Sequence, residues 1–301
     1  MGSTRPGYRE RWFSAQDGLR LFFRDYGSPL APGTPVLCLG GLARNSKDFD
    51  RLARRLCERR RVICPDYRGR GRSSYDTDWR NYRPEVYLND LAHLLAVCNL
   101  HRVLVCGTSM GGLLSMGLAI AKPTALAGVI LNDIGPHLHH RGLARILDYI
   151  GADHPQPDWD TAVAHLKSQF PHLGLGSDER WRAFAEQTYR LGDDGLLRYD
   201  WDLALAKPLI RNRGATPDLW KLYGALRRQP VLTLRGELSD VLSEETLARM
   251  AELKPDLKSV TVPGVGHTPM LDEPPAQTAI DEFIAEIDER EGATPGGHSH
   301  G

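Results

Sequence analysis

The chain has 301 residues, of which 41% are hydrophobic, so it is long enough to bury the core of one large domain. The chain has 38 basic residues (lysine plus arginine) and 38 acidic residues (aspartate plus glutamate). This balance argues against the broad positive surface with which proteins bind nucleic acids. No apolar run approaches the length of a membrane span, and the first residues have no signal-peptide pattern. We therefore expect a cytoplasmic protein with no nucleic-acid or membrane partner, and the sequence does not indicate its oligomeric state.

The chain begins with two polar-apolar segments, residues 9–14 and 19–26, on either side of Asp17-Gly18. This dipeptide favours a tight turn, so we expect an antiparallel hairpin. Short apolar runs, bounded by turn residues and separated by helical patterns, follow at 36–39, 61–65, 103–106, 129–131, 231–234 and 259–262. Such runs are typical of parallel strands buried on both faces. The sequence thus predicts an α/β fold with a mostly parallel central sheet flanked by helices.

The alternation of runs and helices stops between residues 135 and 216. This segment contains amphipathic helical stretches at 142–150, 158–170 and 178–189 and no clear strand. We interpret it as a helical cap inserted into a core formed by residues 1–134 and 217–291. The last segment, 292–301, is a low-complexity sequence and is expected to be disordered.

The pentapeptide Gly107-Thr108-Ser109-Met110-Gly111 joins the predicted 103–106 strand to an apolar helical stretch. The two glycines permit a sharp turn between strand and helix that would expose the Oγ atom of Ser109. A serine hydroxyl becomes a good nucleophile only when a base removes its proton. Ser109 is therefore the candidate nucleophile, provided that a base and an acid follow it in the chain.

Candidates for both partners occur after later strands. His267 lies in a loop rich in glycine and proline beyond the last predicted strand, where a general base is expected. Asp240 lies in the loop after the 231–234 strand and could hold the imidazole in the correct tautomer. Two other carboxylates compete for this role: Asp133, at the end of the 129–131 strand, and Glu237, in the same loop as Asp240.

Together with the segment Asp66-Tyr67-Arg68-Gly69-Arg70-Gly71-Arg72-Ser73, these residues resemble the α/β-hydrolase superfamily. The similarity is greatest to its bacterial carboxylesterases, enol-lactonases and carbon–carbon-bond hydrolases, which have a helical cap. The resemblance implies acyl transfer through a covalent acyl-enzyme, followed by attack of water, with no cofactor or metal ion.

The resemblance also implies an oxyanion hole formed by the backbone N–H groups of Leu42 and Met110. Leu42 belongs to Gly40-Gly41-Leu42, which departs from the family pattern because Gly40 replaces the usual histidine. The arginines and glycines of segment 68–72 lack a complete phosphate-binding motif, so we interpret the segment as a structural loop.

We therefore expect an enzyme that hydrolyses a carboxylic ester or lactone of a small molecule. Carbon–carbon bond hydrolysis of a ring-cleavage product uses the same three residues and stays an alternative. A catalytically silent protein that binds a small molecule on the same fold is a third possibility, but such a protein has no need for a nucleophile, an acid and a base together. Arg44, Trp159 and Trp181 are the candidate substrate contacts, because a charge near the pocket and an aromatic cap are expected.

Overall fold

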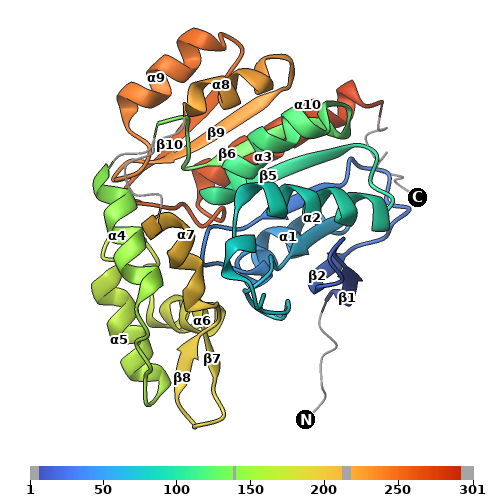
Figure 1. Ribbon diagram of the computed structural model, residues 1–301. Helices are drawn as coiled ribbons and strands as arrows, with labels where there is room; N and C mark the ends of the chain where they lie inside the picture. Colours follow the sequence, from blue (N-terminus) through green and yellow to red (C-terminus); the bar gives the residue numbers. More distant parts are fainter. Residues whose placement is uncertain (1–6, 138–139, 212–217, 293–301) are drawn as a thin grey trace, which may run out of the picture.

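The computed structural model describes residues 7–137, 140–211 and 218–292. Its centre is an eight-stranded sheet in the order β1-β2-β4-β3-β5-β6-β9-β10 (Figure 1). The strands are β1 (Arg9–Ser14), β2 (Arg20–Tyr26), β3 (Val36–Leu39), β4 (Val62–Pro65), β5 (Val103–Thr108), β6 (Leu126–Asn132), β9 (Val231–Gly236) and β10 (Lys258–Val262). Strand β2 runs antiparallel to both β1 and β4, and the remaining neighbours are parallel. The predicted hairpin and the mostly parallel sheet are confirmed.

Helices cover both faces of the sheet (Figure 1). One face packs against α2 (Pro84–Val97), α3 (Met110–Ala121), α8 (Leu219–Gly224) and α9 (Glu244–Leu253). The other packs against α1 (Asp50–Leu56) and α10 (Pro274–Arg290). Because β3, β4 and β6 have helices on both sides, all their residues are buried. Short 3-10 turns complete the fold at η1 (Ser46–Phe49), η2 (Trp79–Asn81), η3 (Pro123–Ala125), η4 (Leu203–Leu205) and η5 (Ala225–Arg228).

Local sequence sets where several helices begin. The side chain of Asn45 accepts a hydrogen bond from the backbone N–H of Lys47 and so caps η1. Ser243 caps α9 in the same way, accepting from the N–H of Thr246. Pro84 begins α2, where its missing N–H has no consequence because the first N–H groups of a helix lack helical acceptors.

The segment between β6 and α8 forms the cap, which we define as residues 140–211. It contains α4 (His140–Gly151), α5 (Trp159–Gln169), α6 (Asp178–Thr188) and α7 (Ala206–Arg211), gathered on one side of the core (Figure 1). It also contains a small antiparallel pair, β7 (Tyr189–Leu191) and β8 (Leu197–Tyr199). The sequence prediction that this segment has no strand is therefore wrong, because two strands of three residues are too short to show an alternating pattern.

Backbone hydrogen bonds join the cap to the loop after β4. The N–H of Gly71 donates to the carbonyl of Asp200 at 2.9 Å, and the N–H of Asp202 donates to the carbonyl of Gly69 at 2.8 Å. Between these bonds, Arg70 and Trp201 form an antiparallel bridge. We call residues 69–71 and 200–202 the cap–core bridge.

The predicted limits of core and cap at 134/135 and 216/217 stay predictions. Apart from Gly292, the tail predicted to be disordered lies outside the described residues. Within the described ranges, no helix combines the length and the apolar character that crossing a membrane requires.

Candidate active site

Ser109 occupies the turn between β5 and α3, with a φ of 52° and a ψ of −117°. A positive φ is unusual for serine, so the fold holds this residue in a strained conformation. The flanking glycines allow the turn to close: a Cβ on Gly107 would overlap the backbone of Gly111, and a Cβ on Gly111 would overlap the carbonyl of Leu39. The sequence motif thus produces the strand-to-helix turn that it predicts.

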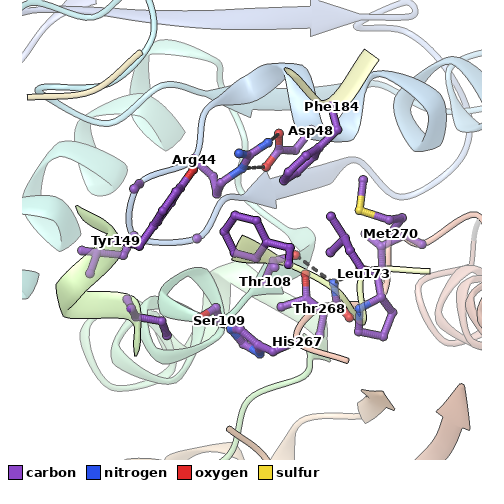
Figure 2. Close-up of a pocket in the computed structure, with 18 of the residues that line it drawn as sticks. Arg44, Asp48, Thr108, Ser109, Tyr149, Leu173, Phe184, His267, Thr268 and Met270 are labelled. Carbon is purple, nitrogen blue, oxygen red and sulfur yellow. Dashed lines mark hydrogen bonds and ion pairs between the residues drawn. The ribbon is translucent and has the colours of Figure 1, made fainter. Parts of the chain in front are cut away.

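His267 lies beside Ser109 at one end of a pocket (Figure 2). Its Nε2 atom is 3.1 Å from the Oγ of Ser109, and its Nδ1 atom is 2.7 Å from the Oδ2 of Asp133. This arrangement suits the tautomer in which Nδ1–H donates to the carboxylate and Nε2 accepts from the hydroxyl. The side chain of Asp133 is fully buried, so the pair with His267 is shielded from water.

The carboxylate of Asp133 is fixed by two further donors. The backbone N–H of Gly236 donates to Oδ1 at 2.8 Å, and the hydroxyl of Ser239 donates to Oδ2 at 2.6 Å. Asp133 directly follows β6 and has a φ of 55°, which turns the chain away from the sheet. Both oxygens are therefore oriented before any substrate binds.

The structure corrects the predicted position of Asp240, which does not contact His267. Its carboxylate accepts two hydrogen bonds from the guanidinium of Arg145 on α4, from Nε and Nη2, each at 2.8 Å. Burial would raise the pKa of Asp240, but the hydrogen bonds and charge of Arg145 outweigh it and hold the pKa below 3.8. Glu237, the third candidate, accepts from the N–H of Gly264 at 2.7 Å and does not contact His267 either. Asp133, the predicted alternative, takes the place on the imidazole.

The loop Gly40-Gly41-Leu42 after β3 lies against the nucleophile, since a Cβ on Gly41 would be 3.8 Å from the Cβ of Ser109. The three carbonyls of the loop all accept hydrogen bonds: Gly40 from the Tyr67 hydroxyl at 3.3 Å, Gly41 from the Arg44 N–H at 3.2 Å, and Leu42 from the Arg70 Nε at 2.8 Å. Fixing the carbonyls also fixes the directions of the N–H groups.

The second predicted oxyanion donor is the N–H of Met110, the first residue of α3. The first N–H groups of a helix have no acceptor within the helix, and its positive end favours a nearby anion. An oxyanion hole formed by Leu42 and Met110 stays a prediction.

The pocket has a mostly apolar wall. The cap contributes the side chains of Ile146, Tyr149, Ile150, Phe170, Leu173 and Phe184, and the core contributes Leu42, Ala43, Phe49, Pro269, Met270 and Leu271. Figure 2 shows Phe184 near Asp48, on the side of the pocket away from Ser109 and His267. A partly apolar substrate would fit such a surface.

Neither Trp159 nor Trp181 lines this pocket, which corrects their prediction as substrate contacts. Trp159 lies under the guanidinium of Arg182, at 4.9 Å, and Trp181 packs edge-on against Phe184, at 6.2 Å between ring centres. Trp181 therefore supports an aromatic ring that faces the pocket, because residues three apart share one side of a helix. The sequence indicated an aromatic cap but not which rings face the nucleophile.

Two arginines contribute to the pocket. Arg44 lines it as predicted, and its charge is paired: Nε and Nη2 bind Asp48 at 2.7 and 2.6 Å (Figure 2). Its Nη1 donates to the Thr188 hydroxyl at 2.7 Å. Arg145 was missed. Its Nη1 has no hydrogen-bond acceptor among the described residues, whereas its other two nitrogens bind Asp240. The sequence held one signal for this role: Arg145 lies four residues before Tyr149 on α4, so the two side chains share one face of the helix.

Within the part of the chain that the structure describes, no three His, Cys, Asp or Glu side chains are grouped so that they could hold a metal ion.

Comparison with known proteins places this site in a family. Residues 30–282 match a model of the alpha/beta hydrolase family. A 3-hydroxybutyrate-oligomer hydrolase from Cupriavidus necator is 36% identical over 274 residues, which cover 87% of this chain and 91% of that protein. A 2-(acetamidomethylene)succinate hydrolase from Mesorhizobium japonicum is 30% identical over 250 residues, or 83% and 85% of the two chains.

A crystal structure of an alpha/beta hydrolase from Novosphingobium aromaticivorans superposes with a TM-score of 0.87 at 42% identity, over 93% of this chain and 98% of that one. The eight-stranded sheet and the strand-to-helix turn at Ser109 agree with that similarity. The chain is therefore a hydrolase that belongs to the alpha/beta hydrolase family.

Proposed function

We propose that the protein is a serine hydrolase that cleaves a carboxylic ester through an acyl-enzyme. The observation that carries this proposal is the continuous contact from Ser109 Oγ to His267 Nε2, at 3.1 Å, and from His267 Nδ1 to Asp133 Oδ2, at 2.7 Å. Nucleophile, base and acid then have the geometry that acyl transfer requires.

In the first step, Ser109 Oγ attacks the ester carbonyl while His267 Nε2 accepts its proton. Asp133 stabilises the resulting imidazolium, and the N–H groups of Leu42 and Met110 donate to the oxyanion, each contributing about 3 kcal/mol to the transition state. His267 then gives the proton to the leaving alcohol, which departs and leaves an acyl-Ser109. Water, deprotonated by the same imidazole, attacks the acyl group; the bond to Ser109 Oγ then breaks as His267 returns the proton to Oγ, and the acid is released.

The substrate that we propose is a short ester of a hydroxy acid, with a free carboxylate. A relative that is 36% identical hydrolyses 3-hydroxybutyrate oligomers, according to its name. The apolar wall suits a short aliphatic acyl chain, and Arg145 Nη1 could donate to the carboxylate. Arg44 is less suited to this role because Asp48 and Thr188 already engage its nitrogens.

A substrate panel tests the proposal. Purified protein is assayed with the linear dimer and trimer of 3-hydroxybutyrate, with neutral aryl and alkyl esters of similar acyl length, and with lactones. We expect the oligomers to give the highest kcat/KM and the Ser109→Ala variant to give none above background. A fluorophosphonate should label wild-type protein at Ser109 and not the variant. Equal rates for wild type and variant, or no labelling of folded protein at neutral pH, would contradict the proposal.

A further inference from the structure

A buried arginine, Arg70, lies behind the loop Gly40-Gly41-Leu42. Arg70 is fully buried, and no carboxylate of the described residues lies within ion-pair distance of it. Its neighbour Arg68 is also buried but binds three carboxylates, those of Asp17, Asp76 and Asp90. Burial of a charge without an opposite charge is costly, so the contacts of Arg70 require an explanation.

The contacts of Arg70 show how the charge is tolerated. The Nη1 atom donates to the carbonyl of Arg68 at 2.7 Å and to the hydroxyl of Tyr87 at 2.9 Å. The guanidinium lies 4.8 Å from the ring centre of Tyr87 and 5.5 Å from that of Tyr67, where the electron-rich ring faces attract a cation. Neutral acceptors and aromatic rings therefore replace the missing carboxylate.

The remaining contact leads to the active site. Arg70 Nε donates to the carbonyl of Leu42 at 2.8 Å, and this charge-assisted bond fixes the peptide between Leu42 and Ala43. The preceding peptide, between Gly41 and Leu42, is fixed by the Arg44 N–H on the carbonyl of Gly41. Because each peptide is planar, the Arg44 bond restrains the direction of the Leu42 N–H, which lies in the same peptide as the Gly41 carbonyl. The Arg70 bond restrains the next peptide plane, and the two bonds together limit the φ and ψ of Leu42 between those planes.

We infer that Arg70 is a positioning residue of the oxyanion hole, which holds the Leu42 N–H ready for the anion that develops on the substrate. This inference rests on the proposed ester hydrolysis. The backbone of Arg70 is itself fixed, because the cap–core bridge pairs it with Trp201. A donor set in place before the reaction avoids reorganisation in the transition state, which is how such groups accelerate acyl transfer.

The test replaces Arg70 by methionine, which keeps much of the volume but donates no hydrogen bond, and by lysine, which keeps a charge and a donor. We expect Arg70→Met to lower kcat on a neutral ester about 10- to 100-fold while KM changes less than about 3-fold, since the effect is on the transition state. Arg70→Lys should recover part of the loss. An alkyl boronic acid, which forms a tetrahedral adduct on Ser109, should lose affinity by a similar factor, whereas a product carboxylate should bind as to wild type.

Arg60→Met is the matched control for loss of a buried arginine. Arg60 is almost fully buried and pairs with Asp288 on α10. Its replacement should lower the melting temperature and leave kcat unchanged. An Arg70→Met variant with wild-type kcat and boronate affinity would overturn the inference, as would a fall in kcat of the same size in Arg60→Met. If Arg70→Met does not fold, Arg70→Lys and Arg70→Gln are judged by the same kcat and boronate criteria.

Failure of the inference about Arg70 can be distinguished from failure of the proposed ester hydrolysis. If wild-type protein neither reacts with a fluorophosphonate at Ser109 nor hydrolyses any ester, the proposed function fails. If wild-type protein does both and the Arg70 variants match it, the positioning inference alone fails.

Discussion

The Oδ2 atom of Asp133 lies 2.7 Å from the Nδ1 of His267, and the same oxygen accepts the hydroxyl of Ser239 at 2.6 Å. We expect Asp133→Asn to lower kcat/KM about 10⁴-fold, because an amide favours the wrong tautomer of the imidazole. Asp240→Asn should cost less than about 10-fold, since its side chain binds Arg145. Steady-state kinetics on one neutral ester compares the two. A larger loss in Asp240→Asn than in Asp133→Asn would contradict the assignment of Asp133 as the acid.

The sequence alone could not choose between these acids, because both follow strands that are neighbours. In the register of β6 and β9, Asn132 pairs with Leu234, so the loops after both strands begin at the same edge of the sheet. The choice depends on Arg145, which reaches Asp240 from a helix 95 residues away. A long-range contact of this kind leaves no local pattern. Ser109 and its turn were predictable because neighbouring glycines determine them.

Replacing Arg145 by glutamine should change substrate preference more than catalysis. We expect the KM for a carboxylate-bearing ester to rise about 10- to 100-fold, which corresponds to loss of a hydrogen bond between charged groups, whereas a neutral ester keeps its KM. The measurement is KM for a matched pair of esters that differ only in the carboxylate. Arg182→Gln, a cap arginine that lies over Trp159 and does not line the pocket, is the control. An equal change for both esters would exclude carboxylate binding by Arg145.

Two glycine-to-alanine substitutions should differ clearly in their effect on the free energy of unfolding. Gly111→Ala would place a Cβ into the carbonyl of Leu39, so we expect the free energy of unfolding to fall by about 3 kcal/mol or more. Gly224→Ala, at the end of α8 with a φ of −56° and open space around it, should be neutral or raise stability by up to about 1 kcal/mol. Urea unfolding followed by circular dichroism checks both. Similar values for the two variants would show that helix α3 can move away from β3 at no cost.

Because Asp240 pairs with Arg145, we expect the difference in stability between wild type and Asp240→Asn to depend on pH in the acid range. The carboxyl of Asp240 has a lowered pKa in the folded protein, so it stabilises the fold at pH values above its usual pKa of 3.8. This contribution is lost as the pH falls through the lower, folded value. The urea midpoints of wild type and Asp240→Asn should therefore differ by a constant amount above pH 5 and converge below pH 3.8. A difference that changes instead between pH 6 and 8 would assign the effect to a histidine.

The cap was less predictable than the core. Its three longer helices follow amphipathic patterns, but the short strands β7 and β8 carry no signal of their own. The aromatic rings that the cap contributes to the pocket are those of Tyr149, Phe170 and Phe184, not those of the tryptophans Trp159 and Trp181. Which side of each cap helix faces the core depends on how the helices pack on one another, and helical periodicity alone does not provide that information.

The cap–core bridge has a consequence for protein engineering. Exchanging caps between relatives is an obvious route to new specificities, with the cuts made where the inserted segment leaves and rejoins the sheet. Here such an exchange would also replace residues 200–202, whose backbone pairs with the loop that carries Arg70. A chimera that retains residues 200–202 of this chain and receives only the foreign helices before them should preserve the hydrogen bond from Arg70 to the carbonyl of Leu42. The cap of this hydrolase can therefore be exchanged only in part, because residues 200–202, which follow β8, also hold the loop that carries Arg70.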